Sequence, residues 1–269
     1  MIGGMIRGMN RRLQLAGAIG AVTCGLATPA FAQSGRSATL EVMSEEERRG
    51  LSWSEGRAAL GGDVRVPVGR FDASARVVTT RDSVRHDGAD AVVDLVLGTG
   101  WDVGAIQVRT DAIGHVFAGS RTKTDYVEAG ISASYGYGPL YATLGVIGAP
   151  SQRAIGGSNL YLYANANAGI PGTPLTVLAE LGHSSGSVRD TVRDTVRAGR
   201  LRPGGSYSNW RLGLEHRRDR LTVGVDYVGT DIAGTGDAGT DISGTGDASR
   251  FADRRNATDR LIGRLQVSF

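Results

Sequence analysis

The residues best suited to hydrolytic chemistry lie around His183. Ser184 and Ser185 follow it directly, and Glu180 is close by in the sequence. Outer-membrane lipid hydrolases use a serine and histidine pair, which must lie within hydrogen-bond reach, with a third group orienting the histidine. Neighbouring residues of a strand point to opposite faces of the sheet. His183 and Ser184 are therefore poorly placed to work together, and the sequence does not favour an enzyme.

Other candidate sites have less support. The stretch GTGWDVG (98–104) has the spacing GxGxxxG and is followed by a strand, whereas a phosphate loop opens a helix. We interpret it as a tight turn. His86, His115 and His216 are scattered along the chain and indicate no metal site, and we predict no cofactor.

Two short duplications lie in the C-terminal part of the chain. Residues 229–248 (GTDIAGTGDAGTDISGTGDA) are two ten-residue copies that differ only at Ala233 and Ser243. Calcium-binding repeats have a nine-residue period and stack in larger numbers, so we predict a flexible external loop, with weak cation binding as the alternative. Residues 189–200 (RDTVRDTVRAGR) indicate a solvated charged segment that could touch anionic lipid headgroups.

The first 32 residues have the layout of a cleavable signal peptide. Three arginines precede an apolar run over residues 13–26, and Ala30-Phe31-Ala32 forms an A-x-A cleavage site. The run is shorter than the roughly 20 residues with which a helix spans a bilayer. Cleavage after Ala32 would remove the only cysteine and leave residues 33–269 as an exported domain.

Composition narrows the class of protein. The chain has 41 glycines, 41% hydrophobic residues and a formal charge of +3, and the signal peptide carries three of the positive charges. A near-neutral chain without a clustered basic face is not expected to bind nucleic acid. A helical period is hard to find after residue 32.

An alternating period, in contrast, recurs along the chain. In LYLYANANA (160–168) leucine and alanine alternate with tyrosine and asparagine, as in a strand with one apolar and one polar face. Most such segments are about ten residues long, which is the length of a tilted strand that crosses a bilayer, whereas strands of soluble sandwiches have about five or six residues. We predict about twelve strands, at residues 38–50, 57–67, 71–80, 90–98, 103–113, 124–135, 139–147, 158–168, 174–183, 206–216, 220–229 and 259–269.

The connections favour the same architecture. From the second strand on, short links such as VGR, TGWD and RRD alternate with longer ones, which include the loops 184–205 and 230–258. Short periplasmic turns that alternate with longer external loops are typical of outer-membrane barrels. The sequence therefore predicts an all-β fold: a transmembrane up-and-down antiparallel β-barrel of about twelve strands in the cell outer membrane.

The chain ends on a strand, LIGRLQVSF, whose last residue is Phe269. In a closed barrel the last strand pairs with the first, so the C-terminus does not fray. A terminal aromatic residue suits the interfacial girdle and is a signal that barrel-assembly machinery reads. We therefore expect that machinery to be a partner of this chain.

The polar faces of the predicted strands carry charges. An arginine at mid-bilayer costs roughly 2–4 kcal/mol on the lipid side, so these charges are expected to face inward. Twelve strands lie between the filled eight-stranded barrel and the open barrel of sixteen strands, and inward glycines such as Gly145 and Gly213 favour free space. A narrow pore and a salt-bridged interior that only stiffens the barrel both stay open. The candidate pore-lining residues are Asp63, Arg65, Arg76, Asp94, Arg109, Asp111, Glu128, Glu180, Arg211, Glu215, Asp226 and Arg264.

Several stretches resemble the TorF-like porin family of Gram-negative outer membranes. RRGLSWSEGRAALGG (48–62) is similar to that family's opening, DYVEAGISASYGYGPLYATLGV (125–146) to its central hairpin, YSNWRLGLE (207–215) to its tryptophan-bearing strand and VDYVGTD (225–231) to its penultimate strand. This chain carries the triplet Glu45–Glu47 where the family favours aromatics, which leaves the upper end of the first strand open. The resemblance implies a barrel that passes small solutes.

Three functions follow, in order of preference. The first is passive diffusion of small hydrophilic solutes through an outer-membrane pore. The second is a non-conducting structural or surface-interaction barrel whose long loops do the binding, and the third is a membrane lipid hydrolase. The expected partners are outer-membrane lipid and lipopolysaccharide, the assembly machinery and small solutes.

Overall fold

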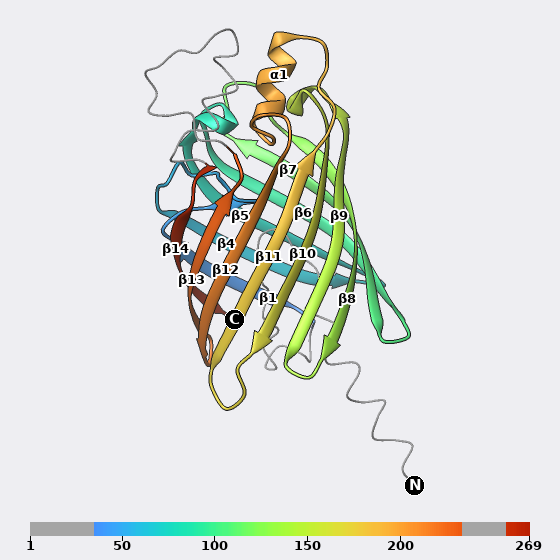
Figure 1. The fold of residues 1–269 in the computed structure, drawn as a ribbon, viewed down its shortest axis with the longest axis vertical. Helices are drawn as coiled ribbons and strands as arrows, with labels where there is room; N and C mark the ends of the chain where they lie inside the picture. Colours follow the sequence, from blue (N-terminus) through green and yellow to red (C-terminus); the bar gives the residue numbers. More distant parts are fainter. Residues whose placement is uncertain (1–34, 233–256) are drawn as a thin grey trace.

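The computed structural model describes residues 35–232 and 257–269, so the predicted signal peptide and most of the duplicated stretch lie outside the described residues. Twelve strands form one closed antiparallel barrel (Figure 1), which confirms the predicted fold class. The barrel strands are β1 (Ser37–Met43), β4 (Ala59–Val68), β5 (Phe71–Ser83), β6 (Ala89–Val103), β7 (Ile106–Ala118), β8 (Tyr126–Tyr137), β9 (Leu140–Gln152), β10 (Gly157–Gly169), β11 (Leu175–Ser185), β12 (Tyr207–Arg218), β13 (Leu221–Thr230) and β14 (Arg260–Ser268).

The barrel closes where β1 pairs with β14. The register of this seam runs from Thr39 opposite Ser268 to Met43 opposite Arg264. The backbone N–H of Phe269 donates to the carbonyl of Ala38 at 2.9 Å, so pairing with β1 extends to the last residue. The expectation that the C-terminal strand is held in a closed barrel is confirmed.

Each predicted strand overlaps a barrel strand, but several boundaries were wrong, and β7 and β9 each continue five residues beyond their predicted ends. The first strand ends at Met43 instead of residue 50, because the chain then turns into the barrel. The stretch TGWD is not a turn, since β6 continues to Val103 and the turn follows at Gly104, whose φ is +62°. Alternation persists through TGWD, where Trp101 points outward opposite Val108.

The two ends of the barrel differ. Five short links, at residues 69–70, 104–105, 138–139, 170–174 and 219–220, lie at one end, here called the turn end. The other end, here called the loop end, carries the segments 44–58, 119–125 and 186–206 and the described residues 231–232 and 257–259. It also carries two 3-10 helices, η3 (Val84–His86) and η4 (Arg153–Ile155). The predicted alternation of link types is therefore present in the fold.

One helix, α1 (Val192–Gly199), stands on the loop end within the segment expected to be an irregular charged loop (Figure 1). Its N-cap residue Thr191 accepts a hydrogen bond at its side-chain oxygen from the backbone N–H of Asp194 at 3.1 Å, a common way to start a helix. The absence of a helical period was therefore too strong an inference for this stretch. Within residues 35–232 and 257–269, no helix is long and apolar enough to cross a membrane.

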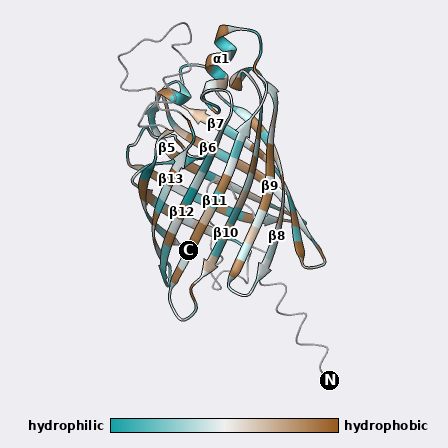
Figure 2. Ribbon diagram, viewed as in Figure 1, coloured by the Kyte–Doolittle hydropathy of each residue, from teal (hydrophilic) through white to brown (hydrophobic). Residues whose placement is uncertain are grey.

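Hydrophilic and hydrophobic residues are interspersed along the barrel strands (Figure 2), and they lie on opposite faces of the wall. Outward side chains such as Leu40, Leu144 and Leu261 are 59%, 66% and 70% exposed, whereas inward side chains are mostly polar and buried. The inward glycines do not leave the free space that the sequence suggested. A Cβ atom at Gly145 would overlap the ring of Tyr163, and one at Gly213 would overlap the carboxylate of Asp226.

Candidate functional site

Residues 44–58, here called the inward segment, leave β1 at the loop end and fold into the barrel before β4 begins. The segment contains a hairpin of β2 (Glu47–Arg48) and β3 (Leu51–Ser52). Its two turn residues, Arg49 and Gly50, both have positive φ angles, of 54° and 78°. Two such residues form the tight turn that matches strand twist, and glycine at the second position makes it inexpensive.

The tip of this hairpin lies against the wall formed by β12 and β13. A Cβ atom at Gly50 would come within 2.7 Å of the Cβ of Asn209, so only glycine fits. The hydroxyl of Tyr207 donates to the carbonyl of Arg49 at 2.9 Å, and Arg260 donates to the carbonyl of Gly50 at 3.1 Å. The backbone of the inward segment is thus hydrogen-bonded directly to the barrel.

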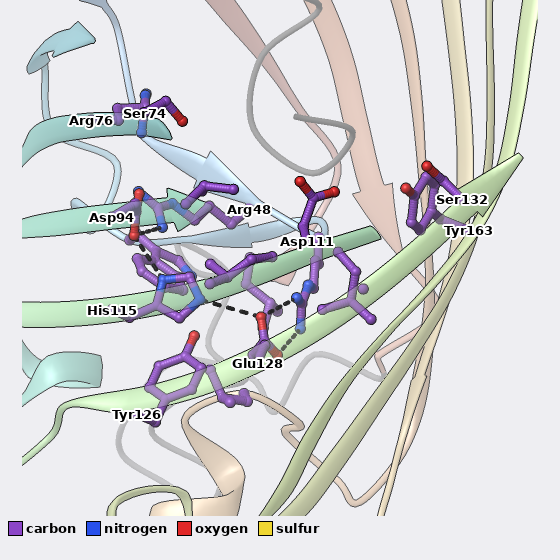
Figure 3. Close-up of a pocket in the computed structure, with 18 of the residues that line it drawn as sticks. Arg48, Ser74, Arg76, Asp94, Asp111, His115, Tyr126, Glu128, Ser132 and Tyr163 are labelled. Atoms are coloured by element: carbon purple, nitrogen blue, oxygen red, sulfur yellow. Dashed lines mark hydrogen bonds and ion pairs between the residues drawn. The ribbon is translucent and has the colours of Figure 1, made fainter. Parts of the chain in front are cut away.

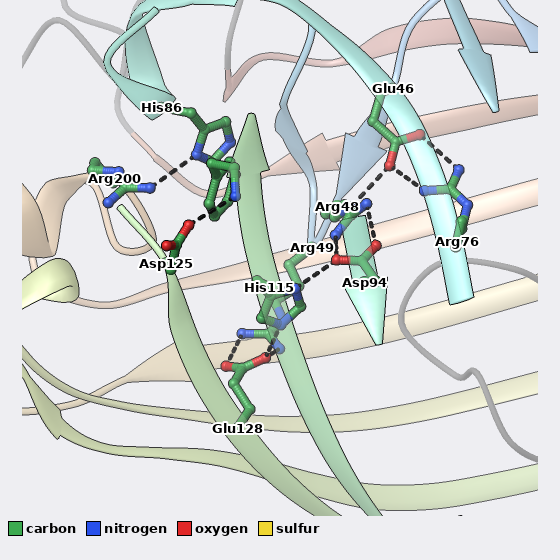
Figure 4. A network of polar contacts seen from close by, with 11 residues as sticks. Glu46, Arg48, Arg49, Arg76, His86, Asp94, His115, Asp125, Glu128 and Arg200 are labelled. Atoms are coloured by element: carbon green, nitrogen blue, oxygen red, sulfur yellow. Dashed lines mark hydrogen bonds and ion pairs between the residues drawn. The ribbon is translucent and has the colours of Figure 1, made fainter. Parts of the chain in front are cut away.

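Two arginines of the inward segment pair with carboxylates of the opposite wall (Figure 4). Arg48 contacts Asp94 of β6 at 2.6 Å, and Arg49 contacts Glu128 of β8 at 2.7 Å. His115 of β7 lies between these carboxylates, with Nδ1 at 2.7 Å from Asp94 and Nε2 at 3.2 Å from Glu128. We call these five residues the segment clamp.

The acidic triplet of the inward segment is used in a similar way on the other side. Glu46 pairs with Arg76 of β5 at 2.8 Å, and Arg76 also contacts Glu41 of β1 at 2.6 Å. Glu45 pairs with Arg260 of β14 at 2.9 Å. Charged side chains of the segment therefore meet countercharges around much of the lumen, which satisfies the requirement that buried charges be paired.

An aromatic cluster packs the inward segment against the loop end. The ring of Trp53 lies 4.2 Å from that of His86 and 5.7 Å from that of Phe117, measured between centroids. The guanidinium of Arg48 lies over the Trp53 ring at 4.1 Å. Such cation–π and aromatic contacts add to the burial of a side chain that is only 4% exposed.

Residues of two loops cover the inward segment at the loop end. Arg85 donates to the carbonyl of Ser52 at 2.9 Å and to the carbonyl of Arg200 at 2.6 Å, and Arg200 donates to the carbonyl of Arg85 at 2.7 Å. Burial lowers the pKa of His86 well below its ordinary value, and the nearby Arg200 and Arg85 lower it further. The cover is therefore built on permanently charged arginines and a neutral histidine.

The two central carboxyl groups of the inward segment have opposite pKa shifts. Burial raises the pKa of Glu46, but the guanidinium groups of Arg76 and Arg48 outweigh it and hold this pKa below its usual value. Burial raises the pKa of Glu47 to about 7, although Arg260 and Arg211 act in the opposite direction. Glu46 is thus a permanent anion, whereas Glu47 titrates near neutral pH.

A small cavity remains between the inward segment and the wall (Figure 3). Its volume is about 70 Å³, and its lining includes Arg49 and Leu51 of the segment and Asp111, Ser132 and Tyr163 of the wall. At roughly 10–15 Å³ of occupiable volume for each molecule, such a space suits about five waters. The lumen beside the segment is therefore narrow.

All twelve sequence-predicted residues point to the inside of the barrel, where the structure places them in several separate groups. Asp94 and Glu128 belong to the segment clamp, and Arg76 holds Glu46. Glu180 accepts a hydrogen bond from the hydroxyl of Tyr161 at 2.9 Å. The remaining residues form contacts within the wall, at Asp63, Arg65, Arg109, Asp111, Arg211, Glu215, Asp226 and Arg264.

Four of these residues, here called the wall cluster, join β12, β13 and β14. Arg211 contacts Asp226 at 2.9 Å, and Arg264 contacts Glu215 at 2.8 Å and Asp226 at 3.2 Å. All four side chains are at most 14% exposed. Both partners of each of these ion pairs belong to the barrel wall, and Arg211 also acts on the charge of Glu47 in the inward segment.

A second wall group lies toward the turn end. Arg109 of β7 pairs with Asp72 of β5 at 2.5 Å and with Asp111 at 2.8 Å, and Arg65 of β4 lies 3.9 Å from Asp72. Asp63 accepts a hydrogen bond from Thr39 of β1. These contacts lie within the barrel wall toward the turn end, and the pair between Arg109 and Asp72 spans the intervening strand β6.

Sequence reasoning missed the residues that fill the lumen. Arg48, Arg49 and Trp53 were not singled out, and His115 was considered only as a scattered metal-ligand candidate. The one available signal was the triplet Glu45–Glu47, whose three adjacent charges cannot all face inward on one strand. That conflict marks the place where the strand ends and the inward segment begins.

The hydrolytic candidate also has a different partner from the one considered in the sequence. Nδ1 of His183 lies 3.1 Å from the hydroxyl of Ser208 on the neighbouring strand β12, and the pair is on the outer face. Asp231 accepts a hydrogen bond from the backbone N–H of Ser208 at 2.7 Å and does not orient the histidine. In the described part of the chain, no group of three metal-ligating side chains gathers in a way that could hold an ion.

Comparison with known protein families gave a match. A family model described as "Bacterial protein of unknown function (Gcw_chp)" matches residues 30–250. A comparison with curated proteins gave no match.

Several solved structures of outer-membrane proteins are similar at low identity. OmpF of Salmonella typhi in complex with daunomycin shares 8% identity over 87% of this chain and 96% of that chain, with a TM-score of 0.42. A loop L8 deletion mutant of OmpT, an outer membrane protein of Vibrio cholerae, shares 10% sequence identity over 87% of this chain and 98% of that chain, with a TM-score of 0.40. The anion-selective porin from Comamonas acidovorans shares 16% over 80% of this chain and 62% of that chain, with a TM-score of 0.35.

Proposed function

The chain belongs to the bacterial Gcw_chp family of unknown function, and from that premise we propose that it is a porin-like channel of the outer membrane. It passes small hydrophilic solutes by passive diffusion, and the inward segment sets how wide the path is. The turn end faces the periplasm and the loop end faces outward, as in barrels with short periplasmic turns. The resemblance of several stretches to TorF-like porins supports the same solute class.

The outer surface supports a membrane location. Strands of about ten or more residues present apolar side chains outward, as a bilayer of typical thickness requires. Exposed aromatic side chains lie near the turn end, where Trp101 is 46%, Tyr137 is 73% and Phe269 is 41% exposed. Aromatic girdles at the membrane interface are common in barrels of this kind.

One observation carries the proposal of a channel: the wall side chains alone do not fill the lumen. The inward segment fits inside the barrel together with Trp53 and two arginines, and its hairpin reaches from β6 and β8 to β12. Eight-stranded barrels are filled by their own side chains, and wider ones hold separate elements or water. Withdrawal of the segment would leave a water-filled path between polar walls.

The same segment supports a second candidate function. Trp53, Leu201, Tyr207 and Arg85 are all 5% exposed or less, so the loop end is tightly packed over the lumen. A barrel that never releases this packing would conduct nothing and would serve as a structural or surface-interaction protein.

Conductance recordings from planar bilayers distinguish the channel from the non-conducting barrel. A variant in which residues 45–57 are replaced by a short glycine–serine turn is expected to give stepwise conductance several times that of the wild type. Heat-modifiable migration on gels establishes that both proteins are folded barrels. A folded variant that conducts nothing would reject the channel and leave the structural barrel.

A further inference from the structure

A basic groove lies on the loop end between α1 and two loops. Its volume is about 700 Å³, and it is bounded by the loop before β8, the 3-10 helix η4 and the start of α1. Five cationic side chains line it against two carboxylates. The cations are Lys123, Arg153, Arg189, Arg193 and Arg197, and the carboxylates are Asp125 and Asp194.

The duplication noted in the sequence accounts for part of this charge. RDTVRDTVRAGR places Arg189, Arg193 and Arg197 at intervals of four residues. Residues four apart lie on one face of a helix, and both Arg193 and Arg197 lie within α1. The duplicated unit therefore produces a row of arginines along one side of the groove.

The two carboxylates of the groove already have partners. Asp125 accepts a hydrogen bond from the backbone N–H of Phe117 at 2.8 Å. Asp194 accepts from the hydroxyl of Thr191 at 2.8 Å and lies 3.8 Å from Arg197. Lys123, Arg153 and Arg193 are exposed, and no carboxylate among the described residues lies within 4.0 Å of them. The groove thus keeps a surplus of positive charge.

Buried arginines hold the groove in shape. Arg200, which follows α1, donates to the carbonyl of Ala154 in η4 at 2.8 Å, and Arg202 donates to the carbonyl of Ser158 at 2.9 Å. Both arginines are at most 4% exposed. Because α1 and η4 are tied together in this way, a ligand would bind without the cost of ordering the two sides.

The groove adjoins the lipid-facing surface of the barrel. Gln152, which lines the groove, accepts from the backbone N–H of Val127 at 3.0 Å. Val127, Leu160 and Leu162 are 54%, 40% and 50% exposed on the outer faces of β8 and β10. A ligand with negative charges in the groove could therefore place apolar chains along these strands.

We propose that this groove binds the phosphate groups of a glycolipid in the outer leaflet, with the acyl chains of that lipid on the adjoining apolar strands. Guanidinium groups form paired hydrogen bonds with phosphate oxygens, which makes arginine well suited to this ligand. The proposal rests on the outer-membrane location and orientation given above.

Titration of the detergent-solubilised full chain with bisphosphorylated lipid A tests the site. The groove variant combines Lys123→Gln, Arg153→Gln and Arg193→Gln. The matched control removes three exposed arginines at the turn end through Arg70→Gln, Arg218→Gln and Arg220→Gln. We expect the groove variant to bind lipid A about tenfold more weakly and the control to stay within about twofold of the wild type.

Three results would overturn the proposal. The first is equal binding by the groove variant and the wild type, and the second is equal binding of lipid A stripped of its phosphates. The third is that sodium pyrophosphate binds as tightly as lipid A, which would assign the groove to soluble anions. Lipid binding by a barrel that never conducts would reject the proposed channel alone, and a conducting barrel that does not bind lipid A would reject the groove alone.

Discussion

Two groups of buried charges share the lumen and differ in what they hold. In the segment clamp the cations Arg48 and Arg49 come from the inward segment, and the anions Asp94 and Glu128 come from the wall. In the wall cluster both signs come from β12, β13 and β14. The two groups use the same side-chain chemistry at similar distances.

The difference lies in when each group can form. Pairs within the wall cluster join strands of the barrel wall and exist whenever the barrel is closed. The arginine–carboxylate pairs of the segment clamp exist only while the inward segment is inside. Its departure would leave Asp94 and Glu128 with His115 and expose them to water, where they are readily solvated. The wall cluster therefore stabilises the barrel, and the segment clamp stabilises the filled state of the lumen.

The largest expected effect comes from removing the cations of the segment clamp. In the double variant Arg48→Ala and Arg49→Ala, the two buried wall carboxylates lose their arginine partners and keep only the shared His115. Breaking one buried pair costs about 3–5 kcal/mol, so the filled state loses most of its advantage. We expect conductance in planar bilayers to approach that of the variant lacking residues 45–57.

The folding of the double variant provides the control for this prediction. The double variant should remain a folded barrel with the heat-modifiable behaviour of the wild type, because its strand pairing is unchanged. A folded double variant whose conductance equals that of the wild type would show that the segment clamp does not hold the inward segment in place.

The contrast between the barrel wall and the inward segment also explains which parts of the structure could be predicted from the sequence. The strand β10 was predicted at residues 158–168 and lies at Gly157–Gly169, because lipid and lumen impose opposite polarities on successive residues. That rule acts residue by residue and needs no knowledge of distant partners. This alternation was sufficient to predict the number of strands, their order and the closure of the barrel.

The inward segment could not be predicted in this way. Glu46 meets Arg76 of β5, and Arg49 meets Glu128, which lies 79 positions further along the chain. No local pattern reports such pairs. The inward glycines misled for the same reason, since the space at Gly145 is taken by Tyr163 from the neighbouring strand.

The wall cluster gives the next largest effect and the opposite phenotype. Arg211→Ala with Arg264→Ala leaves Glu215 and Asp226 without their cations. We expect the barrel to lose about 3 kcal/mol or more of stability, measured as a lower denaturant midpoint for the loss of heat-modifiable migration. Single-channel steps should match those of the wild type, and a large gain in conductance instead would contradict the division between the two groups.

A smaller effect is expected from pH and Glu47. Burial raises the pKa of Glu47 in the filled state to about 7, from an ordinary value of 4.5. The filled state therefore binds more protons between these values, and it loses stability relative to the released state as the pH rises through them. We expect channel opening to increase between about pH 5 and about pH 8.

Substitution of this carboxyl group checks the assignment. Glu47→Gln stays neutral at every pH, so its opening should change much less over the same interval. Glu55→Gln is the matched control, because the Glu55 carboxylate accepts a hydrogen bond from the Val84 backbone in the loop-end cover. The idea fails if Glu47→Gln keeps the full pH dependence of the wild type.

The smallest effect is expected on the outer face, where a polar pair holds neither the barrel nor the inward segment. His183 and Ser208 are 3.1 Å apart, but the histidine is exposed and the nearby Asp231 bonds to the Ser208 backbone. His183→Ala should change stability by less than about 0.5 kcal/mol, as for most exposed substitutions, and should leave conductance unaltered. A catalytic base needs a group that orients it, so hydrolysis of phospholipid vesicles should be no different for the wild type and for this variant. If the wild type hydrolysed these lipids and His183→Ala did not, His183 would be a catalytic residue of the outer face. Polar pairs of this barrel would then serve catalysis as well as the stability of the wall and of the filled lumen.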